Sequence, residues 1–259
     1  MIMQPHIECA PGDIASIVLL PGDPKRVDLI GSFLDSYKNV ADHREFRTIT
    51  GTYQGIPVSV TSTGIGCPST AIAVEELIAC GAKTLIRVGT CGGAWLETIQ
   101  PGSVIIPTAS VRDEGTTIEF MPQGFPAVAD IDIVSALITS AKDAGVQWHK
   151  GINRTHDAFY APDRSVAKWG ECYLDERFKN IPSPIISSEM EASALFVIAS
   201  LRGVRAGAIL AVDSEPTPLK AMALREKYLP NIAYKNKDIS TNAQETMIRT
   251  ALGALKHLI

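Results

Sequence analysis

Short apolar runs rich in β-branched residues alternate along this chain with segments of helical periodicity. "IASIVLLPGDP", "PVSVTSTGIG", "KTLIRVGTCGG", "GSVIIPTASV" and "RAGAILAVD" predict strands, and "TTIEF" is a further candidate strand. "PSTAIAVEELIACG", "DIVSALITSAKDAG", "EMEASALFVIASLRG" and the terminal "TNAQETMIRTALGALKHLI" predict helices. This alternation, with no repeat or low-complexity linker, predicts one α/β domain over residues 1–259 with a mostly parallel or mixed sheet.

The residues that can carry chemistry gather at the expected ends of strands. Asp23 follows the first strand, where it can also cap a helix that begins at Pro24. Further polar turns follow Thr63 and Arg87, and Asp213 ends the run "ILAVD". Because ligands of open α/β sheets bind beyond the carboxyl ends of strands, these turns are the predicted site.

Composition excludes several classes of partner. A net charge of −4 provides no basic field for nucleic acid. No apolar run reaches the roughly 18 residues that suggest a membrane span, and the N-terminus shows no signal-peptide pattern. The 5 cysteines form no C-x-x-C pair, which favours reduced thiols and a cytoplasmic protein.

Two segments can bind an anion. In "LIRVGTCGG", Arg87 lies inside an apolar strand and needs a negative partner, and the following Gly89-Thr90-Cys91-Gly92-Gly93 turn offers backbone N–H groups and a hydroxyl. That partner can be a phosphate or a structural carboxylate. In "PGDPKR", Gly22 can bring backbone N–H groups close to an anion and Arg26 adds positive charge, or the segment can be an ordinary capped helix start with a solvated arginine.

The remaining patterns argue against the common cofactor sites. "GIGCPS" lacks the last glycine of the dinucleotide fingerprint, there is no G-K-[ST] motif, and no histidine spacing suits a catalytic zinc. Glu189 and Glu191 of "SSEMEAS" would point to different faces of a helix, so one can reach a ligand while the other pairs internally. From spacing alone, a solvated helix start, where acids favour the helix dipole, is the preferred interpretation. Cys91 is a candidate nucleophile, but no paired histidine is evident.

Together these motifs resemble the hexameric-type nucleoside phosphorylases. The resemblance spans nearly the whole chain through "VLLPGDPKRV", "HREFRT", "STGIGCPSTAIAVEEL", "IRVGTCGG", "GFPAVADIDI" and "EMEAS". It implies a three-layer α/β/α fold with a mixed central sheet. It also implies reversible phosphorolysis of a nucleoside to free base and ribose 1-phosphate, with inorganic phosphate as co-substrate and no cofactor.

The resemblance further implies residue roles and a homo-oligomer, usually a hexamer built as a trimer of dimers. The implied phosphate site is Gly22, Arg26, Arg87 and Thr90, with Arg44 supplied by the neighbouring subunit. The implied nucleoside site is Cys91, Gly92, Phe159, Tyr160, Glu189, Met190, Glu191 and Asp213, with His6 reaching the 5′-hydroxyl from the neighbour. No catalytic metal is implied, although Glu45, Ile65 and Ser69 match positions that can hold a structural potassium ion.

The base is predicted from the stretch around Asp213. "AVDSEP" resembles the apicomplexan purine enzymes, in which an aspartate at this strand end donates to N7 of the leaving purine. "FYAPDRSVAKW" lacks the glutamine with which uridine phosphorylases recognise uracil. Asp213 and Arg87 are therefore the predicted catalytic residues of a purine nucleoside phosphorylase acting on inosine and guanosine.

Three alternatives remain. "ASVRDEG" and "FPAVADIDI" look as much like uridine phosphorylases, so uridine is the alternative substrate. A nucleoside hydrolase of the same fold would lack the phosphate-binding arginines, whereas Arg26, Arg44 and Arg87 are all present. A non-catalytic ligand-binding relative would have lost a catalytic residue, whereas Glu191 and Asp213 are retained.

Overall fold

One mixed sheet organises the chain. The computed structural model describes residues 2–92, 96, 98–159, 185–213 and 237–259. The strands run in the order β2-β3-β4-β1-β5-β10-β6-β8-β9, and β7 pairs with β6. Their bounds are β1 Ile17–Leu20, β2 Ser36–His43, β3 Phe46–Tyr53, β4 Ile56–Thr61, β5 Thr84–Cys91, β6 Val104–Asp113, β7 Ala127–Val128, β8 Trp148–His156, β9 Ile185–Glu189 and β10 Arg205–Val212.

The strands form two parallel groups of opposite direction. Strands β4, β1, β5 and β10 are parallel to one another, so their carboxyl ends share an edge. Strand β6 pairs antiparallel with β10 and parallel with β8, which pairs parallel with β9. A bridge between Gly92 and Ser188 joins the end of β5 to β9. The end of β9 therefore meets the strands of the first group.

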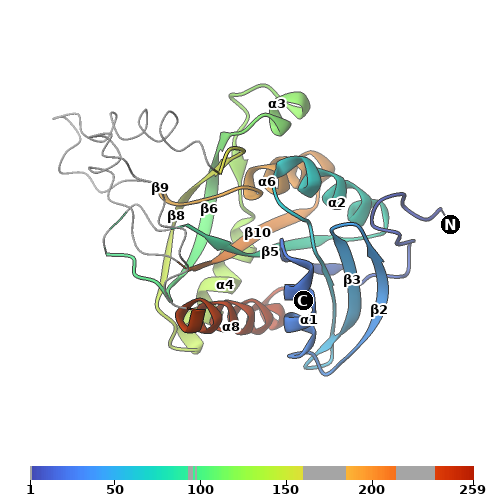
Figure 1. Ribbon diagram of the computed structural model, residues 1–259, viewed down its shortest axis with the longest axis horizontal. Helices are drawn as coiled ribbons and strands as arrows, with labels where there is room; N and C mark the ends of the chain where they lie inside the picture. The colour runs from blue at the N-terminus through green and yellow to red at the C-terminus, as the bar shows by residue number, and fades with distance from the viewer. Residues whose placement is uncertain (1, 93–95, 97, 160–184, 214–236) are drawn as a thin grey trace.

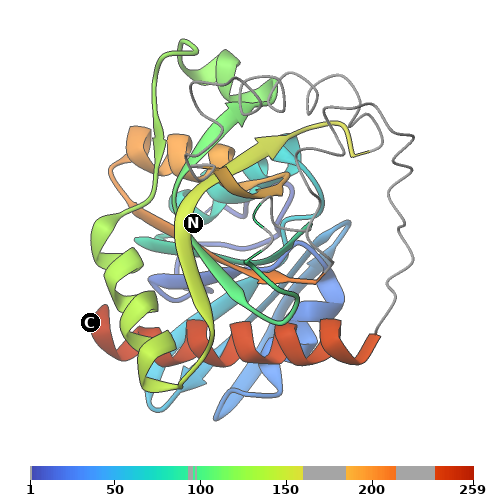
Figure 2. The same ribbon diagram turned by 90° about the vertical axis from the view of Figure 1, so that its left-hand side faces the viewer.

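Helices cover both faces of this sheet, as Figure 1 shows, with α1, α4 and α8 on one side and α2 and α6 on the other. Figure 2 shows α8 lying along its face of the sheet, and α8 packs beside α4. The bounds of the helices are α1 Pro24–Gly31, α2 Cys67–Ala79, α3 Thr116–Phe120, α4 Ile131–Asp143, α6 Ala192–Arg202 and α8 Lys237–Ala254, followed by a 3-10 turn at Leu255–His257. The predicted three-layer α/β/α fold is confirmed.

Each helical layer has its own apolar core. Ile30 of α1, Leu137 of α4 and Met247 of α8 are fully buried on one face of the sheet. Leu77 of α2 and Phe196 of α6 are fully buried on the other face. Burial of each such side chain stabilises the fold by about 1.5–3 kcal/mol relative to an exposed position. The two apolar layers therefore hold the helices against both faces of the sheet.

Local signals explain where several helices begin and end. The Asp23 side chain accepts a hydrogen bond from the Lys25 N–H at 2.9 Å, and Pro24 is the first residue of α1, as predicted. Gly203 closes α6 in the left-handed conformation with φ 67°. Within the described residues, none of the helices is both long and apolar enough to cross a membrane.

Two predictions of local structure are wrong. "TTIEF" forms the short helix α3, where the N–H of Thr117 and its hydroxyl both bond the Glu114 carboxylate. The helix predicted from "EMEASALF" begins only at Ala192, because Glu189 is the last residue of β9. Glu189 and Glu191 therefore do not lie on successive faces of one helix.

Candidate active site

The predicted turns meet at the shared carboxyl edge of β1, β4, β5 and β10. Backbone bonds of 2.9 Å from the Thr63 N–H to the Pro21 carbonyl and of 3.0 Å from Gly64 to Gly22 hold the ends of β1 and β4 together. A Cβ on Gly22 would lie 3.2 Å from the Gly64 carbonyl oxygen, a tight contact that a larger residue could make only if the turn shifted slightly. The close strand ends form the floor of the candidate site.

Arg87 is the central cation of this floor. Its side chain is 6% exposed, with Nε 2.8 Å from Glu189 Oε2 and Nη2 2.5 Å from Glu191 Oε2. Burial disfavours its charge, but Glu191 and then Glu189 keep the pKa of Arg87 above its ordinary value. The guanidinium folds across Gly89, where a Cβ would lie 2.7 Å from Cζ. Arg87 is thus an ionised group with carboxylate partners.

Glu189 is committed to internal contacts. Its Oε1 accepts hydrogen bonds from Asn153 Nδ2 at 2.7 Å and from the Thr155 hydroxyl at 2.6 Å. Its Oε2 accepts the backbone N–H groups of Glu191 and Ala192 at 2.8 and 2.9 Å. Glu189 therefore caps α6 and anchors Arg87, which agrees with the expectation that one of the two carboxylates pairs internally.

Asn153 and Thr155 are contributors that the sequence analysis missed. Both lie on β8 and are fully buried, and the Ser193 N–H also donates to the Thr155 hydroxyl at 3.0 Å. The available signal was the continuous run of polar side chains in "NRTHD", which is unusual for a strand with two covered faces. Such buried polar side chains need partners, and here the partner is Glu189.

Glu191 faces the β4–α2 turn. Its Oε1 accepts the Gly66 N–H at 2.7 Å, and its Oε2 accepts the Met190 N–H at 3.3 Å in addition to the Arg87 ion pair. Burial, reinforced by Glu189, raises the pKa of Glu191, while Arg87 opposes that rise. Met190 is half-buried between Glu189 and Glu191. Met190 and Glu191 are the residues that the family resemblance assigns to the ribose, and this role stays a prediction.

Arg26 brings a second, half-buried cation into the same region. It lies in the first turn of α1, and its Nε donates to Gln244 Oε1 of α8 at 3.1 Å. Burial and then the positive charge of Arg87 lower the pKa of Arg26, whereas Asp23, Asp213 and Glu191 act in the opposite direction. A bound anion would favour both guanidinium charges, so this pair is a suitable anion site.

Asp213 follows β10, as the sequence predicted. Burial raises the pKa of its carboxyl to about 6, although Arg26 and a hydrogen bond from the Thr90 side chain lower it. Parallel pairing places Ala211 beside Thr90, which explains how the ends of β5 and β10 bring these side chains together. An aspartate that titrates near neutral pH can hold or donate a proton during a reaction.

Cys91 and Gly92 complete the end of β5. Burial raises the pKa of the Cys91 thiol well above its ordinary value, and its Sγ contacts the Ala211 carbonyl at 3.6 Å. A thiol held protonated in this way is a poor nucleophile. The Gly92 N–H donates to the Ser188 carbonyl at 3.2 Å, so Gly92 joins β5 to β9.

The two residues assigned to a neighbouring subunit lie elsewhere. His6 contacts Glu76 of α2, and Arg44 is exposed in the turn between β2 and β3 with φ 56°. Phe159 is 50% exposed beyond β8, and Tyr160 lies outside the described residues.

Glu45 and Ser69 come together beside the β4–α2 turn. The Ser69 hydroxyl contacts Glu45 Oε1 at 2.9 Å and bonds the Thr63 carbonyl, while Ile65 is 79% exposed. Carboxylate, hydroxyl and carbonyl oxygens suit a hard cation, and a potassium ion at this position stays a prediction.

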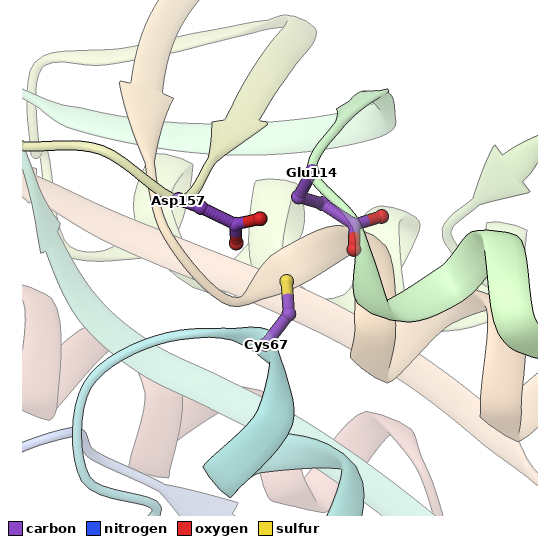
Figure 3. Close-up of side chains that lie close together, drawn as sticks. All are labelled: Cys67, Glu114 and Asp157. Carbon is purple, nitrogen blue, oxygen red and sulfur yellow. The ribbon is translucent and has the colours of Figure 1, made fainter. Parts of the chain in front are cut away.

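A second group of potential ligands lies nearby. Cys67, Glu114 and Asp157 point toward one another in Figure 3, with one ligand atom from each within 4.8 Å of the others. However, the Glu114 carboxylate already accepts bonds from Thr117 and Ser193, and burial beside Glu114 raises the pKa of the Cys67 thiol. Because a metal requires the thiolate, we assign no metal to this group.

The chain is similar to several known proteins. Residues 16–245 match the family model of the phosphorylase superfamily. A uridine phosphorylase of Thermococcus kodakarensis is 47% identical over 81% of this chain and 76% of its own length. One of Treponema pallidum is 41% identical over 98% and 93%. A guanosine phosphorylase of Halorubrum lacusprofundi is 38% identical over 82% and 84%.

Solved structures agree with this fold. A uridine phosphorylase from Vibrio fischeri has a TM-score of 0.82 and 31% identity, covering 99% of this chain and 98% of its own. A purine nucleoside phosphorylase from Toxoplasma gondii in complex with immucillin-H has a TM-score of 0.81 and 31% identity, covering 100% and 97%. This chain therefore belongs to the phosphorylase superfamily, as a nucleoside phosphorylase of the pentosyltransferase class.

Proposed function

We propose that this protein catalyses the reversible phosphorolysis of nucleosides and that uridine is its principal substrate. A phosphate oxygen attacks C1′ of the ribose while the bond between C1′ and N1 of uracil breaks. The bonding electrons leave with the base, which takes up a proton. The products are uracil and ribose 1-phosphate, with inorganic phosphate as co-substrate and no cofactor.

The convergence of Arg26 and Arg87 carries this proposal. Arg87 is buried and ionised, and burial, followed by the charge of Arg87, lowers the pKa of Arg26. Phosphate would relieve this repulsion, with Gly22 and Thr90 beside it and Arg44 arriving from a neighbouring subunit. Held by these groups, the phosphate would stabilise the positive charge that develops on the ribose as the glycosidic bond breaks. A hydrolase would need no such anion site.

The nucleoside would lie against the end of β9. Glu191 and Met190 are assigned to the ribose, and Phe159, together with Tyr160, to the base. Glu191 can bind the ribose hydroxyls by exchanging part of its contact with Arg87, once phosphate supplies that arginine with another negative partner. Cys91 and Gly92 would line the floor below the ribose, and Glu189 would hold Arg87 in place.

Residues from two subunits complete this site. His6 is assigned to the 5′-hydroxyl of a nucleoside bound by the neighbour, so the smallest active unit is a dimer. We propose a hexamer built as a trimer of dimers in the cytoplasm, and oxygens of Glu45, Ile65 and Ser69 as the position for a structural potassium ion. None of these assignments requires nucleic acid or a membrane.

The relatives favour uridine over a purine. The purine preference predicted from "AVDSEP" is not confirmed, because the relatives with 47% and 41% identity are uridine phosphorylases. A purine nucleoside remains the second candidate, for one specific reason. Asp213, whose carboxyl has a pKa of about 6, can donate a proton to a leaving purine, and a guanosine phosphorylase is 38% identical.

Initial rates test this proposal directly. Uridine, inosine and guanosine are each incubated with the protein, with and without inorganic phosphate, and the free base is measured. We expect release of uracil that depends on phosphate. Phosphate-dependent release of hypoxanthine or guanine alone would replace uridine by the second candidate. Equal rates with and without phosphate would refute phosphorolysis in favour of hydrolysis.

A further inference from the structure

A buried carboxylate on α2 holds the start of the chain. Glu76 is 8% exposed and lies on the third turn of the helix. Its Oε2 accepts the backbone N–H groups of His6 and Ile7 at 3.1 and 2.9 Å, and its Oε1 lies 2.6 Å from His6 Nδ1. One side chain therefore fixes both the backbone and the imidazole of His6, although they are separated from it by 70 positions in the sequence.

This geometry determines which imidazole nitrogen carries a proton. The Glu76 carboxylate accepts hydrogen bonds from two backbone N–H groups, as an ionised carboxylate does. Because an ionised carboxylate can only accept hydrogen bonds, it also accepts the bond from the imidazole ring. His6 Nδ1 is then the donor, and in the neutral imidazole Nε2 is the acceptor. The His6 side chain remains 41% exposed, so the ring is both oriented by the protein and accessible from outside it.

A second hydrogen bond, from His43, holds the backbone of His6. The ring nitrogen Nδ1 of His43, at the end of β2, donates to the His6 carbonyl at 2.9 Å. His43 immediately precedes Arg44, the other residue assigned to a neighbouring site. His6 is thus held between α2 and β2, and the two residues that the proposed function assigns to the neighbour are presented by one connected unit.

We propose that Glu76 is a positioning residue for the reaction in the neighbouring subunit. By holding Nδ1–H of His6, it directs Nε2 toward the 5′-hydroxyl of the nucleoside bound there. This inference rests on the proposed function, because it takes the role of His6 from it. It extends that function by assigning a specific task to a side chain that does not itself touch substrate.

The substitution Glu76→Gln isolates this task. The amide oxygen can still accept the two backbone N–H groups, so the N-terminal turn is retained. The amide nitrogen then faces His6 Nδ1 as a donor, which reverses the preferred tautomer and removes the carboxylate. The matched control is Glu75→Gln on the same helix, since Glu75 contacts the exposed Arg202 rather than the N-terminal segment.

The readout is the ratio of kcat/KM for uridine to that for 5′-deoxyuridine, which lacks only the 5′-hydroxyl. We expect Glu76→Gln to reduce this ratio about fivefold to tenfold, the value of one hydrogen bond, because the imidazole loses the charged acceptor that orients it toward the 5′-hydroxyl. The value of kcat/KM for 5′-deoxyuridine should be nearly unchanged. We expect Glu75→Gln to leave the ratio unchanged. In a His6→Ala background, Glu76→Gln should have no further effect on it.

Several outcomes would overturn the inference, and they separate it from the proposed function. An equal loss with both substrates in Glu76→Gln, or an unchanged ratio, would make Glu76 a purely structural anchor while phosphorolysis by the wild type stands. A further loss of the ratio in the His6→Ala background would show that Glu76 does not act through His6. A wild type that does not distinguish the two substrates would remove His6 from the site and this inference with it. If the wild type acts only on purine nucleosides, inosine and 5′-deoxyinosine replace the two substrates.

Discussion

Replacing Asp213 with asparagine should change how the stability of the protein depends on pH. Burial raises the pKa of this carboxyl to about 6, compared with about 4 for a free aspartate. The native state therefore binds the proton more tightly than the unfolded state does. The contribution of Asp213 to stability is fully present below pH 4 and falls as the pH rises through about 6, by up to about 3 kcal/mol.

Asparagine does not titrate, so Asp213→Asn avoids this loss. Between about pH 3 and pH 8 we expect the free energy of unfolding of the variant, relative to that of the wild type, to increase by up to about 3 kcal/mol. Chemical unfolding of both proteins at matched pH values measures this difference, and other titrating groups cancel from it. A difference that is independent of pH would refute the reasoning about Asp213.

Asp35 offers a control of opposite sign. Backbone N–H groups of Gly55 and Gln54 lower the pKa of this exposed carboxyl. Its contribution to stability is therefore present above the pKa of the unfolded chain and is lost as the pH falls. Asp35→Asn should lose stability relative to the wild type as the pH rises from acid, the reverse of the trend expected for Asp213→Asn.

Two further substitutions test the floor of the site. Arg87→Ala should raise the KM for phosphate and lower the free energy of unfolding by about 3–5 kcal/mol, because two buried carboxylates lose their cation. An unchanged KM would remove Arg87 from the phosphate site. The control Arg202→Ala breaks an exposed ion pair and should lower the free energy of unfolding by at most about 1 kcal/mol. Gly64→Ala should lower the midpoint temperature of thermal unfolding, because the φ angle of Gly64 is +71° and the new Cβ would lie 2.7 Å from Glu45 Cγ and 2.8 Å from Ser69 Oγ. An unchanged midpoint would mean that the turn relaxes freely.

Most of the fold was predictable because its elements carry local signals. The Asp23-Pro24 start of α1, the apolar run of β10 and the periodicity of α4 all give the observed elements. The prediction failed where the local signal favoured the wrong state. The β-branched residues of "TTIEF" suggest a strand. However, the backbone N–H and the hydroxyl of Thr117 donate hydrogen bonds to the Glu114 carboxylate, and a helix begins there.

The residues of the candidate site were predictable from the sequence, but the ion-pair partners of Arg87 were not. An arginine in an apolar strand had to have a negative partner, and both a phosphate and a carboxylate satisfied that requirement. The structure provides Glu189 and Glu191 as partners of Arg87, because β9 runs opposite to β5 and ends beside it. The direction of β9 relative to β5 follows from the packing of the whole sheet, which no local pattern specifies.

By itself, the sequence determined the α/β class, the turns at the strand ends and the residue types that can bind an anion, because these depend on periodicity and on the chemistry of single side chains. Only the tertiary structure decided which groups meet. It brings the charges of Arg26 and Arg87 close enough to repel each other, and it buries Asp213 so that its pKa rises to about 6. It also places the His6 imidazole within hydrogen-bond distance of Glu76. Burial and the distances between charges arise when segments remote in sequence pack together, so they cannot be derived from any one segment.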